Sequence, residues 1–324
     1  MKRFCGYVIA LLLIVPGYVG AAWAEAGYPN KPIRFIVPNP PGGLPDTVAR
    51  LLAQQLGERL GQPVIIDNRP GANGVVAAQA LSASPADGYT FLVTDGSMLS
   101  VNPVIYKNLG YNPKKDFVPV SLVATAPLFL AVHTKVPANN LQEFIQLAKT
   151  KPGSINYGSS GVGSTHHLTM EAMNDALGLK MTHVPFKGTG QSVPALIGEQ
   201  VEALFSAYPS LSGFVKTGQV RILANNSAQR SRLAPNVPSL SELIPGFDFA
   251  PAIGVLAASG TPVAVIQRIS AEIAQIAKKP EFIQQMGSAG IEPIGAGPAE
   301  YAAAIQRETE RYAKVINAVG LQAQ

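Results

Sequence analysis

The chain has 324 residues, of which 47% are hydrophobic and 14% are charged, with 31 Gly, 27 Pro and one Cys. This length and apolar fraction predict a globular protein of one large or two medium domains and exclude a disordered chain. A single Cys excludes a disulfide framework and a thiolate zinc cluster. The four His, without a concentrated acidic cluster, leave no expected metal site.

The first residues have the three parts of a secretory signal peptide. Lys2 and Arg3 precede the apolar run 7–15, and a small-x-small cleavage site ends at Ala24. The apolar run is too short to span a bilayer, and no later stretch of about 18 apolar residues follows it. We expect cleavage after Ala24, with residues 1–24 as the signal peptide, and a mature protein in the periplasm.

Removal of the signal peptide leaves 23 of the 25 basic residues against 20 acidic ones, a net charge of +3. The basic residues are scattered along the chain rather than clustered. So small an excess does not indicate a nucleic-acid partner.

Strand and helix patterns alternate in the first part of the mature chain. Apolar runs predict buried strands, and apolar residues four apart predict a helix over 46–60 that ends at Gly61. The expected strands are 33–37, 64–66 and 89–93, with helices at 46–60 and 74–82. This alternation is typical of a parallel sheet covered by helices.

The alternation restarts after residue 127. We expect strands at 128–132, 155–157, 183–184, 201–205 and 220–224, and helices at 141–149, 164–177 and 193–197. A connection rich in Pro, Ser and charge follows, and then a strand at 253–257 and helices at 263–277 and 299–315. The fold class is therefore α/β, with two Rossmann-like domains and a ligand cleft between them: 25–124 plus 248–324 form the first domain, and 125–247 the second.

Three strand-to-helix turns rich in Gly and small polar residues are the candidate binding site. They run over 39–46, 157–165 and 185–190. Free N–H groups at a helix start suit a carboxylate or phosphate, and glycine lets a ligand approach the backbone. The alternative is that these are ordinary turns, with Asp46 and Ser164 as helix caps. Two such turns in separate domains, both at the carboxyl ends of strands, favour a shared anion site.

Catalytic signatures are missing from these turns. Residues 158–163 form neither a nucleophile elbow nor a Walker loop, and His166 replaces the third glycine of a dinucleotide fingerprint, so no cofactor is expected. A hydrolase using Ser160 and His166 would lack both the elbow and an identified orienting acid, so we expect no enzyme.

Two side chains near the turns have alternative interpretations. His166 and His167 are adjacent on a helix start and point about 100° apart, so both cannot face one site, and which of them faces the cleft stays open. Lys187 is either a contact to a bound anion or a solvated side chain.

Motifs spread along the mature chain resemble the substrate-binding proteins of tripartite tricarboxylate transporters, the Bug-type receptors. They include the run Tyr157-Gly-Ser-Ser-Gly-Val-Gly-Ser-Thr-His-His167 and the turn Pro41-Gly-Gly43 with Asp46. The other matching segments are 28–38, 68–74, 87–90, 183–188, 221–224, Arg230, 237–238 with Glu242, and 259–262.

The resemblance implies a type II periplasmic binding protein-like fold, whose two domains close on a ligand as a Venus flytrap does, without catalysis. It implies a small organic acid as ligand, either a di- or tricarboxylate or an aromatic acid, and the transporter's membrane subunits as partners. A receptor that feeds a sensor kinase is the alternative. We expect a monomer.

In the family, backbone amides and bridging waters from two loops hold one carboxylate, and these loops correspond to the first and second turns. The site residues assigned on these grounds and from the turns are Pro40, Pro41, Gly42, Gly43, Leu44, Asp46, Ser159, Ser160, Gly161, Gly163, Ser164, Thr165, His166, Lys187 and Gly188.

Two departures from the family pattern affect the ligand. Leu44 and Pro45 stand where small or hydroxyl residues are usual, so side-chain hydrogen bonds are not expected there. Ala252 replaces a tryptophan that is often found two residues before the glycine at Gly254. If Ala252 lines the pocket, the pocket has extra apolar room for an aromatic or longer acid.

Overall fold

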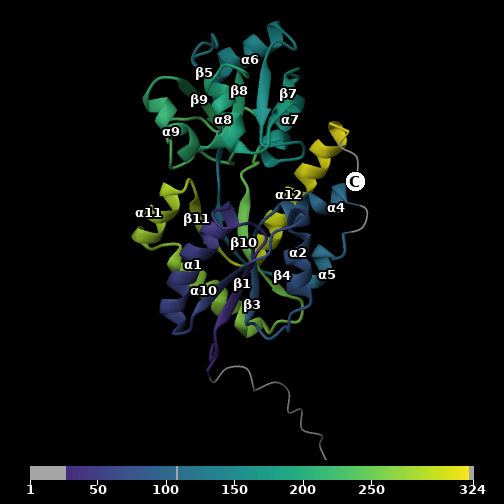
Figure 1. Ribbon diagram of the computed structural model, residues 1–324, viewed down its shortest axis with the longest axis vertical. Helices are drawn as coiled ribbons and strands as arrows, with labels where there is room; N and C mark the ends of the chain where they lie inside the picture. The colour runs from purple at the N-terminus through teal and green to yellow at the C-terminus, as the bar shows by residue number, and fades with distance from the viewer. Residues whose placement is uncertain (1–26, 107–108, 321–324) are drawn as a thin grey trace, which may run out of the picture.

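The computed structural model describes residues 27–106 and 109–320. The predicted signal peptide lies outside these residues. Two lobes, one above the other in Figure 1, are each built on one sheet. The six strands of the first sheet lie in the order β11 (Glu292–Ala296), β4 (Phe117–Thr125), β10 (Ala252–Ala258), β3 (Thr90–Asp95), β1 (Ile33–Val37) and β2 (Val64–Asn68). The five strands of the second lie in the order β7 (Thr182–Pro185), β6 (Asn156–Ser159), β8 (Ala203–Ala207), β5 (Leu128–His133) and β9 (Val220–Asn225).

Both sheets are mixed, which corrects the expectation of a parallel sheet. β1 pairs in parallel with β2 and β3, but β10 is antiparallel to both β3 and β4. The reason is the path of the chain: β10 enters the first lobe from the second, and so it runs against strands that point toward the second lobe (Figure 1). β5 makes the reverse crossing and is antiparallel to β8 and β9.

Helices cover both faces of the first sheet. Apolar side chains of α1 (Leu44–Leu60), α10 (Val263–Ile276) and α11 (Pro280–Ser288) form one buried cluster with β1 and β10. On the other face, α2 (Val75–Ser82), α3 (Ser97–Ser100) and the start of α12 (Pro298–Ala318) form a second cluster. The short helices η1 (Ala72–Gly74), α4 (Asn102–Ile105) and α5 (Pro113–Asp116) lie in the connections.

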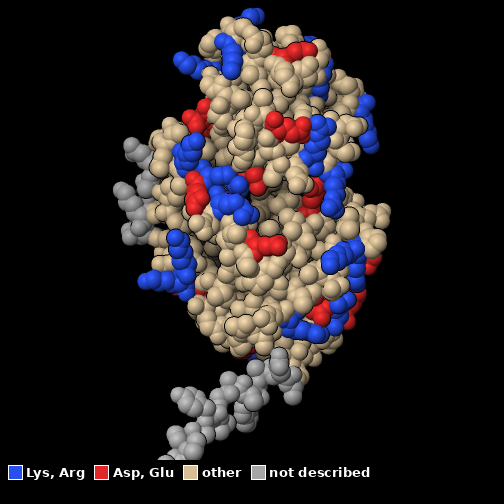
Figure 2. All heavy atoms as spheres, turned by 180° about the vertical axis from the view of Figure 1, so that it is seen from behind, with Lys and Arg blue, Asp and Glu red and all other residues tan. Residues whose placement is uncertain are grey.

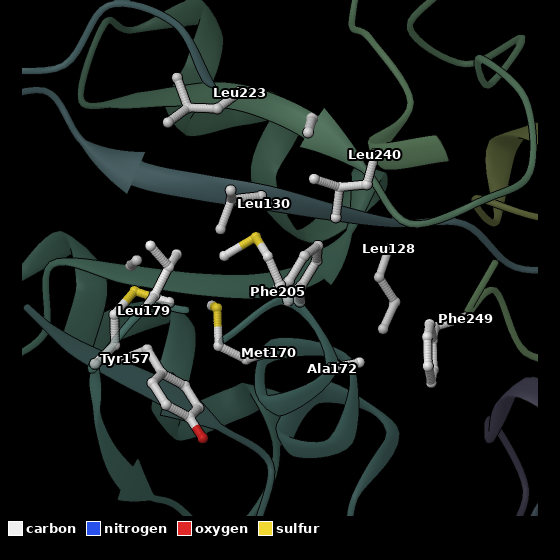
Figure 3. Packing of buried hydrophobic residues seen from close by; sticks show 14 of the residues in the cluster. Leu128, Leu130, Tyr157, Met170, Ala172, Leu179, Phe205, Leu223, Leu240 and Phe249 are labelled. Atoms are coloured by element: carbon white, nitrogen blue, oxygen red, sulfur yellow. The ribbon is translucent and has the colours of Figure 1, made fainter. Parts of the chain in front are cut away.

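The second lobe has the same layered arrangement. Its larger core lies between the sheet and the helices α6 (Leu141–Thr150) and α7 (Thr165–Leu177), and Figure 3 shows part of this core around Leu130, Met170 and Phe205. The helices α8 (Thr189–Ile197) and α9 (Tyr208–Lys216) cover the opposite face, and η2 (Leu240–Glu242) lies in the connection back to the first lobe.

Helix α12 contributes to the cores of both lobes. Tyr301 and Ala304 near its start pack in the first lobe, whereas Tyr312, Val315 and Ile316 near its end belong to the core of the second. The division of the chain into domains near residues 124 and 248 stays a prediction, with α12 reaching across it. Within the described residues, no helix is both long and apolar enough to cross a membrane.

Candidate binding site

The first predicted turn is organised by the buried carboxylate of Asp46. It accepts hydrogen bonds from the Gly42 N–H at 2.8 Å, from Arg50 Nε at 2.9 Å and from Asn68 Nδ2 at 2.8 Å. Burial alone would raise the pKa of Asp46, but these hydrogen bonds lower it below its ordinary value. The interpretation of Asp46 as a helix cap is wrong, because α1 begins two residues earlier and its N-cap is Gly43.

Two of the backbone donors in the first turn are used within the turn itself. The Gly42 N–H donates to the carboxylate just described, and the Gly43 N–H donates to the Pro40 carbonyl at 3.2 Å. Pro45 has no N–H to offer. The amides of Leu44 and Asp46 have no hydrogen-bond partner within 27–106 and 109–320, as is usual in the first turn of a helix.

The second predicted turn ends in a capped helix start. As expected, Ser164 is the N-cap of α7: its Oγ accepts the His167 N–H at 3.2 Å and donates to the Gly161 carbonyl at 2.7 Å. Gly161 has a φ of 131°, a conformation that favours glycine. The amides of Thr165 and His166 have no partner in the described part of the chain, so α7 offers a pair of donors like that of α1.

The two adjacent histidines have different surroundings. His166 Nδ1 lies 2.8 Å from Ser160 Oγ, and burial lowers the pKa of His166 to about 4. His167 is buried; its Nδ1 accepts the Gly163 N–H at 3.1 Å, and its ring stacks on His183 with the centroids 3.9 Å apart. His167 therefore belongs to the interior of the second lobe, and His166 is the histidine that borders the turn.

The contact between Ser160 and His166 has the reach of a nucleophile–base pair but lacks its other parts. No carboxylate contacts the His166 ring among the residues that the structure describes. An imidazole with a pKa of about 4 is neutral at pH 7 and a weak base. The contact therefore orients the two side chains and does not activate the serine.

The third predicted turn packs against the second. The Gly188 N–H donates to the Ser160 carbonyl at 3.3 Å, and the Phe186 N–H donates to the Ser159 carbonyl at 3.1 Å. The Lys187 side chain is exposed. The structure thus joins the second and third turns into one surface and leaves Lys187 at its edge.

A pocket of about 220 Å³ adjoins the first turn at the carboxyl ends of β1, β2 and β3. Only Pro40 of its lining is among the assigned site residues, although Asn39 also lies in the first predicted turn. The other lining residues are Pro38, Asn39, Pro70, Gly71, Ala72, Asn73, Gly74, Thr94, Asp95, Ser97 and Met98. The run Gly71-Ala-Asn-Gly74 is a sequence signal for such a turn, and in the structure Asn73 has a φ of 50°. The pairing of β1 with β3 places the ends of both strands beside this turn.

Helix α12 brings the first-lobe pocket close to the second turn. The Glu308 carboxyl packs directly on Gly96, just after β3, where it leaves no room for a Cβ. One helical turn later, the Tyr312 hydroxyl interacts with the Thr165 side chain at the start of α7. Residues four apart share one helix face, so the end of β3 and the start of α7 are neighbours.

Two α/β lobes joined by crossing strands, with donor-bearing helix starts in both, are the architecture of a solute-binding protein. Residues 48–321 match the family model described as tripartite tricarboxylate transporter family receptor, and the chain belongs to this family. It is 34% identical over 315 residues to the protein BugT of Bordetella pertussis, an alignment that covers 97% of this chain and 96% of BugT.

Solved structures of related proteins have the same fold. The Rhodopseudomonas palustris protein Rpa4515, solved with adipate, is 30% identical with a TM-score of 0.76, over 92% of this chain and 100% of that one. MatC from the same organism, solved with bound malate, is 28% identical with a TM-score of 0.70, over 89% of this chain and 100% of that one. These comparisons confirm the predicted family, the fold class and a binding protein rather than an enzyme.

Proposed function

We propose that this chain is a periplasmic receptor that captures a small organic carboxylate between its lobes and delivers it to a tripartite tricarboxylate-type permease. One observation carries the proposal: α1 and α7 each begin with two backbone amides that have no partner in the described residues. Two relatives were solved with adipate and with malate, both dicarboxylates, which supports this ligand class.

The proposed recognition relies on backbone donors rather than on a charged side chain. Each hydrogen bond to an ionised acceptor is worth about 1.5–3 kcal/mol, and a helix N-terminus favours negative charge. Among the donors are the amides of Leu44 in the first lobe and of Thr165 and His166 in the second. The other residues assigned to the three turns then shape the approach of the ligand, and the exposed Lys187 contributes long-range attraction.

The ligand itself is identified by a thermal-shift screen over organic acids that begins with adipate and malate. A ligand that binds only the native state raises the unfolding temperature, because it adds about 2.7 kcal/mol at a hundredfold excess over its Kd. If no di-, tri- or aromatic carboxylate shifts the unfolding temperature, the proposed ligand class is wrong.

The backbone-donor mechanism is tested at Thr165, the first residue of α7. Thr165→Pro removes its N–H, and Pro is tolerated there because the first helical position needs no donor. The preceding residue, Ser164, has φ −68° and ψ 157°, a conformation compatible with a following proline. Thr165→Val is the matched control, since it keeps the N–H and the shape but loses the hydroxyl.

We expect Thr165→Pro to weaken binding of the identified acid at least about tenfold in calorimetry, the cost of one charge-assisted hydrogen bond. Thr165→Val should lose less, and Lys187→Met about 1 kcal/mol or less, as for an exposed charge. The mechanism is wrong if Lys187→Met abolishes binding while Thr165→Pro folds and binds normally.

The periplasmic location is tested on the protein as it is made in cells. The mature protein recovered from a periplasmic extract should begin at Glu25 or within a few residues of it, as N-terminal sequencing will read directly. Retention of the full chain in the cytoplasm would overturn both the cleavage and the location.

A further inference from the structure

A second cavity, of about 310 Å³, lies at the waist of the molecule between the lobes. Its floor is the half of the first sheet formed by β10, β4 and β11, whereas the turns of the candidate binding site follow β1 and β6. α12 and the connection 227–232 form its walls. We call this cavity the hinge pocket, because the chain crosses between the lobes beside it. It contains none of the residues assigned to the ligand site above.

Four arginines line the hinge pocket: Arg230, Arg232, Arg307 and Arg311. Arg230 donates two hydrogen bonds of 2.8 Å to Glu242, which lies outside the pocket. Arg311 is paired with Asp248 at 3.5 Å. Arg232 and Arg307 form no ion pair within residues 27–106 and 109–320. Figure 2 shows basic and acidic side chains close together around the waist.

Three polar atoms of the hinge pocket are buried without a hydrogen-bond partner in the described part of the chain. They are Arg311 Nε, Ser227 Oγ and Glu308 Oε2. These atoms are enclosed within the wall of the cavity rather than open to it, and Glu308 Oε2 lies against Gly96, so they do not by themselves indicate a bound group. The side chain of Glu308 is itself 95% buried, with 5% exposed.

The acidic residues of the hinge pocket balance only part of its positive charge: Asp248, which lines it, pairs with Arg311. Glu292 accepts hydrogen bonds from Ser231 Oγ at 2.6 Å and from the Arg232 N–H at 2.7 Å, so its carboxylate already holds the connection. Burial and the nearby Asp95 raise the pKa of Glu308 to about 8, so its carboxyl is largely protonated at pH 7 and can donate a hydrogen bond. The pocket therefore favours one added negative charge.

The rest of the lining is apolar. Leu122, Ala250, Ala252 and Ala304 are buried and border the cavity. Ala252 contributes only a methyl group to this lining and so leaves space beside the arginines. A cavity of this size is at the lower end of the 300–1,000 Å³ typical of small-molecule sites.

We propose that the hinge pocket is a second binding site, for a monocarboxylate with a short aliphatic chain. The guanidinium groups of Arg307 and Arg311 hold the carboxylate, and the aliphatic chain lies on Ala252 and Leu122. This site is separate from the receptor site proposed above and does not depend on it.

The test is calorimetry of the whole mature protein with butyrate as the probe. The double variant Arg307→Gln/Arg311→Gln should bind butyrate at least tenfold more weakly than the unmodified protein. Arg268→Gln is the matched control, because it removes an exposed arginine on α10 far from the pocket, and it should bind butyrate normally. Thr165→Pro removes a donor of the receptor site instead and should leave butyrate binding unchanged.

Two further measurements define the recognised chemistry. 1-Butanol, which has the same chain without the charge, should not bind, and inorganic phosphate should bind more weakly than butyrate. If the double variant does not melt cooperatively, the single variant Arg307→Gln replaces it, because Arg307 is exposed and its substitution should not disturb the fold. Arg307→Gln should also weaken butyrate binding. The proposal is overturned if butyrate does not bind, if Arg307→Gln binds it normally, if Thr165→Pro abolishes its binding or if phosphate binds as well as butyrate.

Discussion

Gly254 allows a close approach between α12 and the first sheet. A Cβ at this position would overlap the Tyr301 ring and lie 2.7 Å from the Ser121 carbonyl. Tyr301 is fully buried, so its ring has no space into which it could retreat. Only glycine fits between the sheet and the helix here.

Gly254→Ala should therefore destabilise the protein by at least about 2 kcal/mol, as expected for overpacking of a tight core. Gly213→Ala is the control within α9: a Cβ there meets nothing within 4 Å. Because alanine restricts the unfolded chain and favours a helix, Gly213→Ala should be neutral or stabilise by up to about 1 kcal/mol. Urea unfolding of both variants checks the pair, and equal stabilities would contradict the packing argument.

Asp46 stabilises the first turn through its ionised form. Asp46→Ala removes the acceptor of three donors, and at pH 7 it should cost about 2–3 kcal/mol of unfolding free energy. Because its pKa is lowered in the folded state, this contribution is present above the unfolded pKa near 3.8 and is lost as the pH falls through the folded value. Asp175→Ala, at an exposed position of α7, should cost little. A similar loss of unfolding free energy for both variants would show that the buried carboxylate stabilises the fold no more than an exposed one.

For individual side chains, the sequence predicted the roles that depend on residues nearby in the chain. The Ser164 cap forms with an amide three residues away, and its type and position were sufficient to indicate it. The role of Asp46 depends on Asn68, 22 residues away in β2, and no local pattern indicates that contact. For the same reason Asp95 and Glu308 were missed, since they meet only through the tertiary fold.

At the scale of elements, α12 is the part of the fold that depends most on tertiary context. Glu308 lies on this helix between the two lobes, almost completely buried, with Asp95 and Asp248 as acidic neighbours and Arg311 as the nearby cation. The buried hydroxyls of Tyr301 and Tyr312 lie near the same carboxyl. Burial is the largest cause of the raised pKa of Glu308, and so deprotonation opposes folding.

The contribution of Glu308 to the stability of the protein should fall as the pH rises from about 5 to about 8. Glu308 has a pKa of about 8 when folded and near 4.5 when unfolded, so in this window the folded state binds more protons than the unfolded state. The slope is up to about 1.4 kcal/mol per pH unit. Glu308→Gln, which mimics the neutral form, should remove it.

His166 and His183 act in the opposite direction below about pH 6.5, because burial lowers the pKa of each to about 4. The difference between the urea midpoints of the unmodified protein and of Glu308→Gln at pH 6.5, 7 and 8 therefore isolates the effect of Glu308, since the histidines are the same in both. Parallel pH profiles of the unmodified protein and Glu308→Gln would show that this carboxyl is not protonated in the folded state.

The alternation of elements was largely predicted, but two strands were not. β4 contains Pro119, and β11 contains Pro293 and Gly295, which weaken a strand pattern. Both strands form because β10 supplies an edge on which β4 pairs, and β4 in turn pairs with β11. The direction of β10 was also missed, since it depends on the lobe from which the strand enters and not on its own residues.

Across the waist of the molecule, three segments of the described chain connect the lobes: the two crossings of the backbone and α12. The lobes also touch through the bonds of Ser231 and Arg232 to Glu292, and through Gly290, whose Cβ would lie 2.5 Å from Pro209. These contacts lie on the β11 side of the waist, away from the turns after β1 and β6. A rotation about this side would move the two sets of turns toward each other with little change within either lobe.

We therefore expect an organic acid that binds the receptor site to close the lobes. A carboxylate that bridges the amides of Leu44 and Thr165 interacts better with a closed form than with an open one, and this difference in affinity is what shifts the equilibrium. Solution scattering of the mature protein should show a smaller radius of gyration with saturating ligand than without it. Thr165→Pro should reduce the contraction at the same ligand concentration, whereas Arg268→Gln should contract as the unmodified protein does. An unchanged radius with a tightly bound acid would exclude the hinge motion, even if the acid occupies the proposed site.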